Sequence, residues 1–108
     1  MRQPEDATGA THTIAGALLT VGDTAEAVAE VLRTYGCCGI ANDPCDNPIT
    51  SFLSRFGVRN LEVAWNGRGY MARSGAYEQD VSVPLPDPAA IFMAQFDAGQ
   101  WPDLDVNS

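Results

Sequence analysis

The dipeptide Asn66-Gly67 constrains the fold more than any other feature, because it separates two segments in which apolar and polar residues alternate. Asn-Gly is typical of tight β-hairpins, since both residues tolerate the positive φ that a type I′ turn requires. A two-residue loop would place three apolar positions of the first strand on one face of the sheet. The cross-strand pairs that it predicts are Trp65 with Arg68, Val63 with Tyr70 and Leu61 with Ala72.

A third alternating segment follows Ser74-Gly75, and its period of two predicts another strand. Its apolar positions are Tyr77, Val81, Val83 and Leu85. The three segments together predict an antiparallel meander with one apolar face that other elements must cover. Residues 69–80 are weak strand formers, so a hairpin that turns at Ser74-Gly75 and leaves two long strands stays open as an alternative. In either arrangement we expect Trp65 to be substantially buried against the helices.

Helix signals occur before and after these strands. The first helix is expected to open at Asp23, with Glu26 completing a capping box, and to end at Gly36. The second should be capped by Asn47, and the third by Asp87, each with a proline at its first position; Gly57 and Gly99 should end them. The apolar stripes predicted for the three helices are Val28, Val31, Leu32 and Tyr35; Ile49, Phe52, Leu53 and Phe56; and Ala89, Phe92, Met93 and Phe96.

The predicted fold class is therefore α+β: a small antiparallel sheet of two or three strands, as a meander, with about three helices packed on one face. Residues 1–22 are expected to form an N-terminal arm or extra element, with a loose segment up to residue 10. Thr11–Val21 fits either a helix or a strand. Residues 23–104 should form one domain, and residues 105–108 a tail.

The charge distribution limits the possible partners. The formal net charge is −8, and all six basic residues are arginine. From Ser74 onward six acidic residues occur without a basic one. Such a surface repels phosphate backbones and anionic lipids, so we expect neither nucleic acid nor membrane as a partner, and favour a protein with a basic surface. The acidic residues that precede the apolar run 14–21 do not fit a signal peptide, and cytoplasmic localisation is expected.

Three cysteines, Cys37, Cys38 and Cys45, are the candidates for redox chemistry or metal binding. A structural zinc site needs four ligands, and here His12, Asp43 or Asp46 would have to complete the set. Buried or semi-buried free thiols are the favoured interpretation. Cys45 precedes a helix N-terminus, which stabilises a thiolate, so it is the expected reactive thiol if one exists.

Two further patterns have ordinary structural explanations. The oxygen-rich stretch 42–47 lacks the spacing of a calcium loop, and its Asx-Pro sequences are typical of turns. The residues Gly67, Gly69 and Ala72 match a dinucleotide-binding fingerprint only formally, because no helix is expected to begin inside it. There is one histidine and no lysine or G-x-S-x-G motif, so no nucleophile and base are evident and no cofactor is expected.

The segment after Gly99 alternates apolar and acidic residues and has two interpretations. Trp101 and Leu104 could fold back over the last helix and close the core. Alternatively, the segment could dock onto a basic, hydrophobic groove of a partner. The residues that this second interpretation assigns to partner binding are Trp101, Asp103, Leu104 and Asp105.

Three short motifs resemble small proteins of actinobacterial genomes, for which the resemblance implies no activity. They begin at Cys45 (Cys-Asp-Asn-Pro), Val83 (Val-Pro-Leu-Pro) and Phe96 (Phe-Asp-Ala-Gly-Gln-Trp-Pro-Asp-Leu). The sequence thus favours a small acidic, non-enzymatic protein-interaction or regulatory domain. A thiol-based redox or metal-binding module is the alternative.

Overall fold

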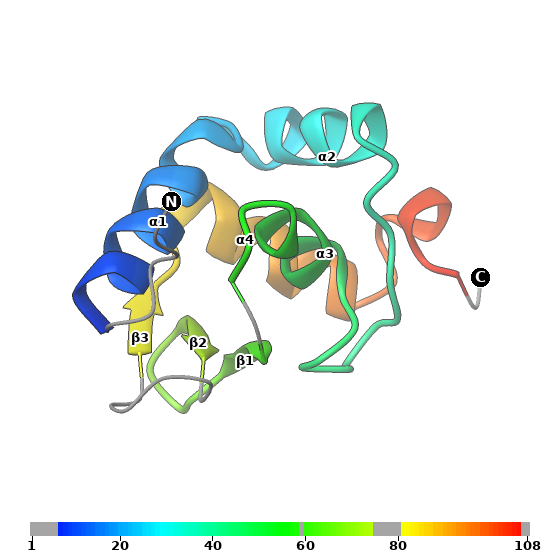
Figure 1. Ribbon diagram of the computed structural model, residues 1–108. Coiled ribbons are helices and arrows are strands. Elements are labelled where there is room, and N and C mark those ends of the chain that lie inside the picture. The colour runs from blue at the N-terminus through cyan, green and yellow to red at the C-terminus, as the bar shows by residue number, and fades with distance from the viewer. Residues whose placement is uncertain (1–6, 59, 75–80, 107–108) are drawn as a thin grey trace.

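The computed structural model describes residues 7–58, 60–74 and 81–106, and it confirms the α+β fold class. Three helices precede the strands and a fourth follows them, so these ranges hold one α-helix more than expected (Figure 1). In chain order the elements are α1 (Ala7–Thr20), α2 (Ala25–Thr34), α3 (Pro48–Ser54), β1 (Leu61–Trp65), β2 (Tyr70–Ser74), β3 (Val81–Pro84), α4 (Asp87–Asp97) and a short 3₁₀ helix, η1 (Pro102–Leu104).

The strands form an antiparallel sheet in the order β1-β2-β3, so the three-stranded meander is confirmed and the two-strand alternative is wrong. The sheet lies at the bottom of the view in Figure 1, with α2, α3 and α4 above it and α1 beside β3. Tyr77 lies outside the described residues.

The predicted two-residue hairpin loop is wrong, because the loop contains four residues. Trp65 pairs with Tyr70, Val63 with Ala72 and Leu61 with Ser74. The side chain of Asn66 explains the longer loop: its Oδ1 accepts hydrogen bonds from the amides of Arg68 and Gly69, at 2.9 and 3.1 Å. The register therefore differs from the predicted one by two residues, which leaves every side chain on its expected face.

Helix α1 settles the ambiguity at Thr11–Val21 in favour of a helix, which already begins at Ala7. The expected loose segment therefore does not extend to residue 10. The side chains of Ile14, Ala17 and Leu18 are buried in the same core as those of the other elements. Composition left the choice open, and packing of this apolar face beside β3 favours the helix.

The helix caps agree with the sequence in one case out of three. Asn47 caps α3 as predicted: its Oδ1 accepts from the amide of Thr50 at 2.9 Å, and Thr50 Oγ1 accepts from the amide of Asn47 at 3.0 Å. The cap of α2 is Thr24 and not Asp23, since Thr24 Oγ1 accepts from the amide of Ala27. In α4 the N-cap is Pro86 without a side-chain bond, so Asp87 is the first helical residue and not the cap.

The core contains most of the predicted stripe residues; Val31 in α2 is partly buried against it, and the two exposed exceptions lie just past their helices. Tyr35 is the C-cap of α2, and Phe56 follows the C-cap of α3; both rings are about half exposed. Trp65 is also exposed, at 60%, so its predicted burial is wrong. It shares a sheet face with the buried Leu61 and Val63, but it is the last residue of β1, where that cover ends.

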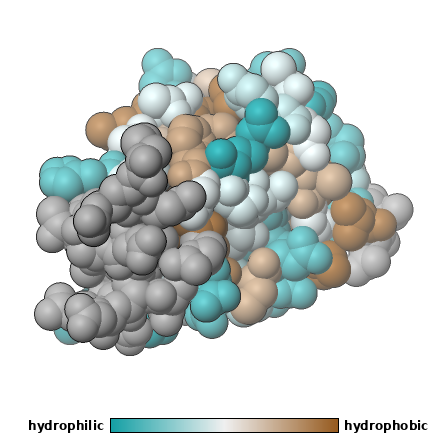
Figure 2. Space-filling view, viewed as in Figure 1, coloured by the Kyte–Doolittle hydropathy of each residue, from teal (hydrophilic) through white to brown (hydrophobic). Residues whose placement is uncertain are grey.

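Helices of sufficient length and hydropathy to cross a bilayer are absent from the described ranges. On the face shown in Figure 2, hydrophobic residues occur in several areas between hydrophilic ones.

Candidate functional site

A groove between the β1–β2 hairpin and α4 combines exposed apolar side chains with charged ones. We call it the hairpin groove; its volume is about 550 Å³. The hairpin supplies one wall and α4 the other, with the segment that joins β3 to α4 between them. Its lining residues are Trp65, Asn66, Arg68, Gly69, Tyr70, Met71, Pro84, Leu85, Asp87, Ala90, Ile91 and Ala94.

Two large apolar side chains face solvent in this groove, one on each wall. Trp65 on the hairpin is 60% exposed and Ile91 on α4 is 51% exposed. The Trp65 ring packs edge-on against Tyr70, its cross-strand partner, with ring centroids 5.6 Å apart and an interplanar angle of 68°. The indole thus contacts one neighbouring ring while most of its surface stays accessible.

Trp65 and Tyr70 also line a second, smaller hollow of about 200 Å³, which we call the side hollow. Its remaining lining includes the carboxylates of Asp43 and Asp97. The two hollows share this aromatic pair, so a ligand that contacts the rings can reach both.

A hydrogen-bond network around Asp97 fixes the relative positions of the groove walls. The hydroxyl of Tyr70 donates to Asp97 Oδ2 at 2.9 Å, and the amide of Asn42 donates to Oδ1 at 2.9 Å. The side-chain amide of Asn42 donates to the carbonyl oxygen of Asp97 at 3.2 Å. Asn42 has a φ of 64°, a left-handed conformation that asparagine tolerates better than most residues. The hairpin, α4 and the 37–47 loop are therefore joined at one carboxylate.

Burial raises the pKa of Tyr70 from 10.0 to about 12, and the hydrogen bond to Asp97 and the negative charge of Asp97 act in the same direction. The phenol is therefore neutral at physiological pH and acts as a donor within the network. A base for proton abstraction works best with a pKa near the operating pH, so this shift moves Tyr70 away from such a role.

The charged groups around the two hollows are mostly negative. Asp87 and Arg68 line the hairpin groove, and Asp43 and Asp97 line the side hollow. Two of the three carboxylates already accept hydrogen bonds within the protein: Asp97 from Tyr70 and Asn42, and Asp43 from the amides that follow it. The summed charge of the residues that line the two hollows is therefore negative, like the net charge of −8 of the whole chain.

The cysteine candidates do not come together as a site. Cys37 is buried, whereas Cys38 and Cys45 are exposed, and all three are free thiols. Among the described residues, no group of three or more histidine, cysteine or acidic side chains is arranged to hold a metal ion. Cys45 and Asp46 line a separate polar hollow of about 300 Å³ beside α3.

The oxygen-rich stretch 42–47 is a turn, as expected from its sequence. Asp43 Oδ1 accepts from the amides of Cys45 and Asp46, at 3.0 and 3.2 Å, and so shapes the backbone that leads into α3. The glycines of the apparent dinucleotide fingerprint belong to the hairpin loop, and strand β2 follows them instead of a helix.

The C-terminal candidates are part of the packed domain. Leu104 is buried, and the Trp101 ring lies 5.9 Å from the ring of Phe92, with its Nε1 donating to Gln95 Oε1 at 3.1 Å. Asp105 forms a parallel bridge with Gly39. These contacts match the fold-back interpretation of the segment, and they leave Leu104 inaccessible to a partner.

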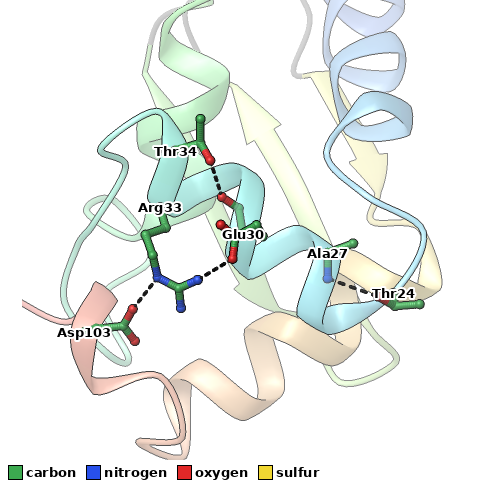
Figure 3. A network of polar contacts seen from close by, with 6 residues as sticks. All are labelled: Thr24, Ala27, Glu30, Arg33, Thr34 and Asp103. Atoms are coloured by element: carbon green, nitrogen blue, oxygen red, sulfur yellow. Dashed lines mark hydrogen bonds and ion pairs between the residues drawn. The ribbon is translucent and has the colours of Figure 1, made fainter.

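Asp103, the remaining tail candidate, is bound to α2. Figure 3 shows the guanidinium of Arg33 between two carboxylates: Nε donates to Asp103 Oδ2 at 2.7 Å and Nη1 to Glu30 Oε1 at 2.8 Å. The hydrogen bond from Arg33 lowers the pKa of Asp103 below its ordinary value of 3.8. This exposed network attaches η1 to the helix layer and does not form a cavity.

Comparison with known proteins leaves the site without a template, since no family model, curated protein or solved structure matches the chain. The sequence did not indicate the hairpin groove. One signal was present: Ile91 is apolar but lies off the stripe of α4, so it could have been recognised as a surface residue with a possible role in recognition.

Proposed function

We propose that this protein is a non-enzymatic cytoplasmic binding domain, and that its hairpin groove holds a protein segment in which apolar side chains alternate with basic ones. The observation that carries this proposal is the exposure of Trp65 and Ile91 on facing walls of one groove. Tryptophan is one of the residues most enriched among those that dominate the energy of protein interfaces.

The charge of the two hollows taken together supports a basic partner. Asp87 and Arg68 line the hairpin groove and offset each other in charge, whereas Asp43 and Asp97 line the adjoining side hollow without a basic residue. A lysine or arginine flanking the docked apolar residue would reach these carboxylates. The net charge of −8 would also accelerate the encounter with a basic segment and disfavour an acidic one.

The rigidity of the site supports recognition of a preformed shape. The network at Asp97 ties both walls together, so the groove exists before a ligand arrives. Binding then costs little reorganisation of the protein. The raised pKa of Tyr70 is consistent with a structural donor in a binding site.

Selection from a random peptide library displayed on phage tests the proposal directly. We expect the selected peptides to combine leucine, phenylalanine or tryptophan with neighbouring lysine or arginine. Their affinity should fall at least about tenfold with Ile91→Ser, because this change removes the exposed apolar side chain from the α4 wall without adding a charge. The affinity of the wild-type protein for these peptides should also decrease as salt is added, because salt screens the attraction between the flanking charges.

Leu19→Ser is the matched control, because Leu19 is also an exposed aliphatic side chain, at 76%, but lies on α1 and does not line the groove. This variant should bind the selected peptides as the wild type does. Selection of acidic peptides, failure to enrich any sequence, or equal losses in the two variants would each refute the proposal.

A further inference from the structure

A further pocket, whose only charged residue is basic, lies where the ends of three helices meet. We call it the helix-end pocket; its volume is about 360 Å³ and it is lined by Thr20, Val31, Tyr35, Phe52, Arg55 and Phe56. Thr20 is the last residue of α1, Tyr35 the C-cap of α2 and Arg55 the C-cap of α3. Pockets that bind small molecules have volumes of about 300–1,000 Å³ and a mostly apolar lining with few polar groups.

Three aromatic rings and Val31 form the apolar part of this pocket. The Phe52 ring lies 6.1 Å from that of Tyr35 in a tilted contact, with an interplanar angle of 58°, and 5.4 Å from that of Phe56 in an edge-on contact, at 64°. Phe52 is buried, whereas the outer two rings are about half exposed. The rings thus leave apolar surface open toward the hollow, where an apolar group could be covered on more than one side.

Arg55 is the one charged residue in the lining, and its charge is opposite to that of the protein as a whole. The guanidinium carbon lies 4.7 Å from the centre of the Tyr35 ring. Both ion pairs found in the described ranges belong to Arg33, so a carboxylate from these ranges does not neutralise Arg55. A guanidinium stacked on an aromatic ring keeps its in-plane donors for a carboxylate, which it can bind through two parallel hydrogen bonds.

The ends of these helices oppose this positive charge less than open helix ends would. In the last turns of α2 and α3, the carbonyl oxygens of Leu32, Arg33, Phe52 and Leu53 already accept hydrogen bonds from amides that follow them in the chain. Thr20 Oγ1 donates to the carbonyl oxygen of Ala17 at 2.7 Å. Carbonyls that are satisfied in this way present less negative potential than the open end of a helix.

From the aromatic lining and the isolated guanidinium we infer that the helix-end pocket binds a small organic carboxylate with an apolar or aromatic body. The body lies against Tyr35, Phe52 and Phe56, and the carboxylate pairs with Arg55. This inference is independent of the hairpin groove, whose partner is basic and much larger.

Phenylbutyrate and its neutral analogue phenylbutanol, which have the same carbon skeleton, test the inference on the intact protein. Titration of the labelled protein, followed by amide nuclear magnetic resonance, should give saturable shifts centred on Tyr35, Phe52 and Phe56 with phenylbutyrate. Phenylbutanol should bind roughly tenfold more weakly, because it lacks the charge-assisted hydrogen bonds. Similar affinities for the acid and the alcohol would overturn the inference.

Two variants separate the role of Arg55 from a general effect of charge. Arg55→Gln should reduce the affinity for phenylbutyrate to that of phenylbutanol and leave the alcohol unaffected. Arg73→Gln removes an equal charge from an exposed position on β2, outside the pocket, and should change neither affinity. Shifts that map elsewhere, or equal losses of phenylbutyrate affinity in the two variants, would refute the assignment.

Discussion

The hydroxyl of Tyr70 donates a 2.9 Å hydrogen bond to Asp97 Oδ2, and this bond connects the first residue of β2 to the last residue of α4. The same carboxylate accepts from the amide of Asn42. The side chain of Asp97 therefore joins the β1–β2 hairpin, α4 and the 37–47 loop beside the hairpin groove.

This bond predicts a loss of stability at alkaline pH. The pKa of Tyr70 is raised from 10.0 to about 12 in the folded protein, so the folded state binds this proton more tightly than the unfolded state does. The contribution is complete below pH 10 and is lost as the pH rises from 10 to about 12. The melting temperature of the wild type, measured by circular dichroism, should therefore fall more steeply in this window than that of Tyr70→Phe.

Tyr35→Phe provides the control for other tyrosines, because the half-exposed ring of Tyr35 belongs to the helix-end pocket and not to the Asp97 network. It should retain the steep alkaline loss of the wild type. Parallel curves for the wild type and Tyr70→Phe would contradict the assigned role of this hydrogen bond.

Trp65 should matter for binding much more than for folding. Because its side chain is mostly exposed and its main ring contact is with Tyr70, we expect Trp65→Ala to lower the free energy of unfolding by less than about 1.5 kcal/mol. Phe96→Ala, which empties a fully buried position, should cost about 3–5 kcal/mol. Urea titrations measure both, and a loss for Trp65→Ala comparable to that for Phe96→Ala would show that the indole belongs to the core.

The sequence predicted those parts of the fold that are encoded by short-range patterns. The stripe of α4, the cap of α3 at Asn47 and the alternation from Leu61 to Val63 in β1 are local signals, and the structure agrees with each. The prediction of a two-residue hairpin loop failed because Asn66 is compatible with two loops. It can occupy a two-residue turn, or its side chain can close the four-residue loop that the structure contains. Dipeptide identity alone does not distinguish these.

Burial at the ends of elements depends on tertiary packing, and this is where prediction failed. Trp65, Tyr35 and Phe56 each continue an apolar period, yet each lies where its strand or helix ends and the covering layer stops. Both hollows proposed for binding are built around these residues. The candidate sites were therefore missed because sequence periodicity assigned their main side chains to the core.

Thiol reactivity should distinguish the three cysteines. Cys37 is 2% exposed, whereas Cys38 and Cys45 are exposed. Ellman's reagent should therefore modify two thiols in the native protein and the third only after denaturation, because the reaction requires access to the sulfur. Cys37→Ser should retain two rapidly reacting thiols and Cys45→Ser one. A native count of zero would indicate a bound metal or blocked thiols and revive the thiol-based alternative.

Gly39 is required by a close approach of two backbone segments. A Cβ at this position would lie 2.4 Å from Asn47 Cα and 2.7 Å from the carbonyl oxygen of Asp46. Backbone atoms cannot move aside like a flexible side chain, so Gly39→Ala should cost about 1–3 kcal/mol or more. Gly69→Ala is the control, since nothing lies within 4 Å of its Cβ position. Its cost should stay within about 0.5 kcal/mol, and equal melting temperatures for the two variants would disprove the packing argument.

The C-terminal segment should stabilise the domain through Leu104. This side chain is 3% exposed, and the backbone beside it is held by hydrogen bonds from the Gly39 amide to the Leu104 carbonyl and from the Val106 amide to the Gly39 carbonyl, at 3.0 and 2.8 Å. Leu104→Ala should therefore lower the free energy of unfolding by about 2–5 kcal/mol. Val106→Ala should change it by less than about 0.5 kcal/mol, because Val106 is 58% exposed.

Chemical denaturation of the two variants also decides between the interpretations of this segment. A lid must contribute to the stability of the domain that it closes, whereas a docking peptide must detach at little cost before it can enter a partner. A large loss for Leu104→Ala alone is expected for the lid. If both variants unfolded at the same denaturant concentration as the wild type, the contacts of Trp101 and Leu104 would be too weak to retain the segment. Docking onto a basic partner would then become the better explanation.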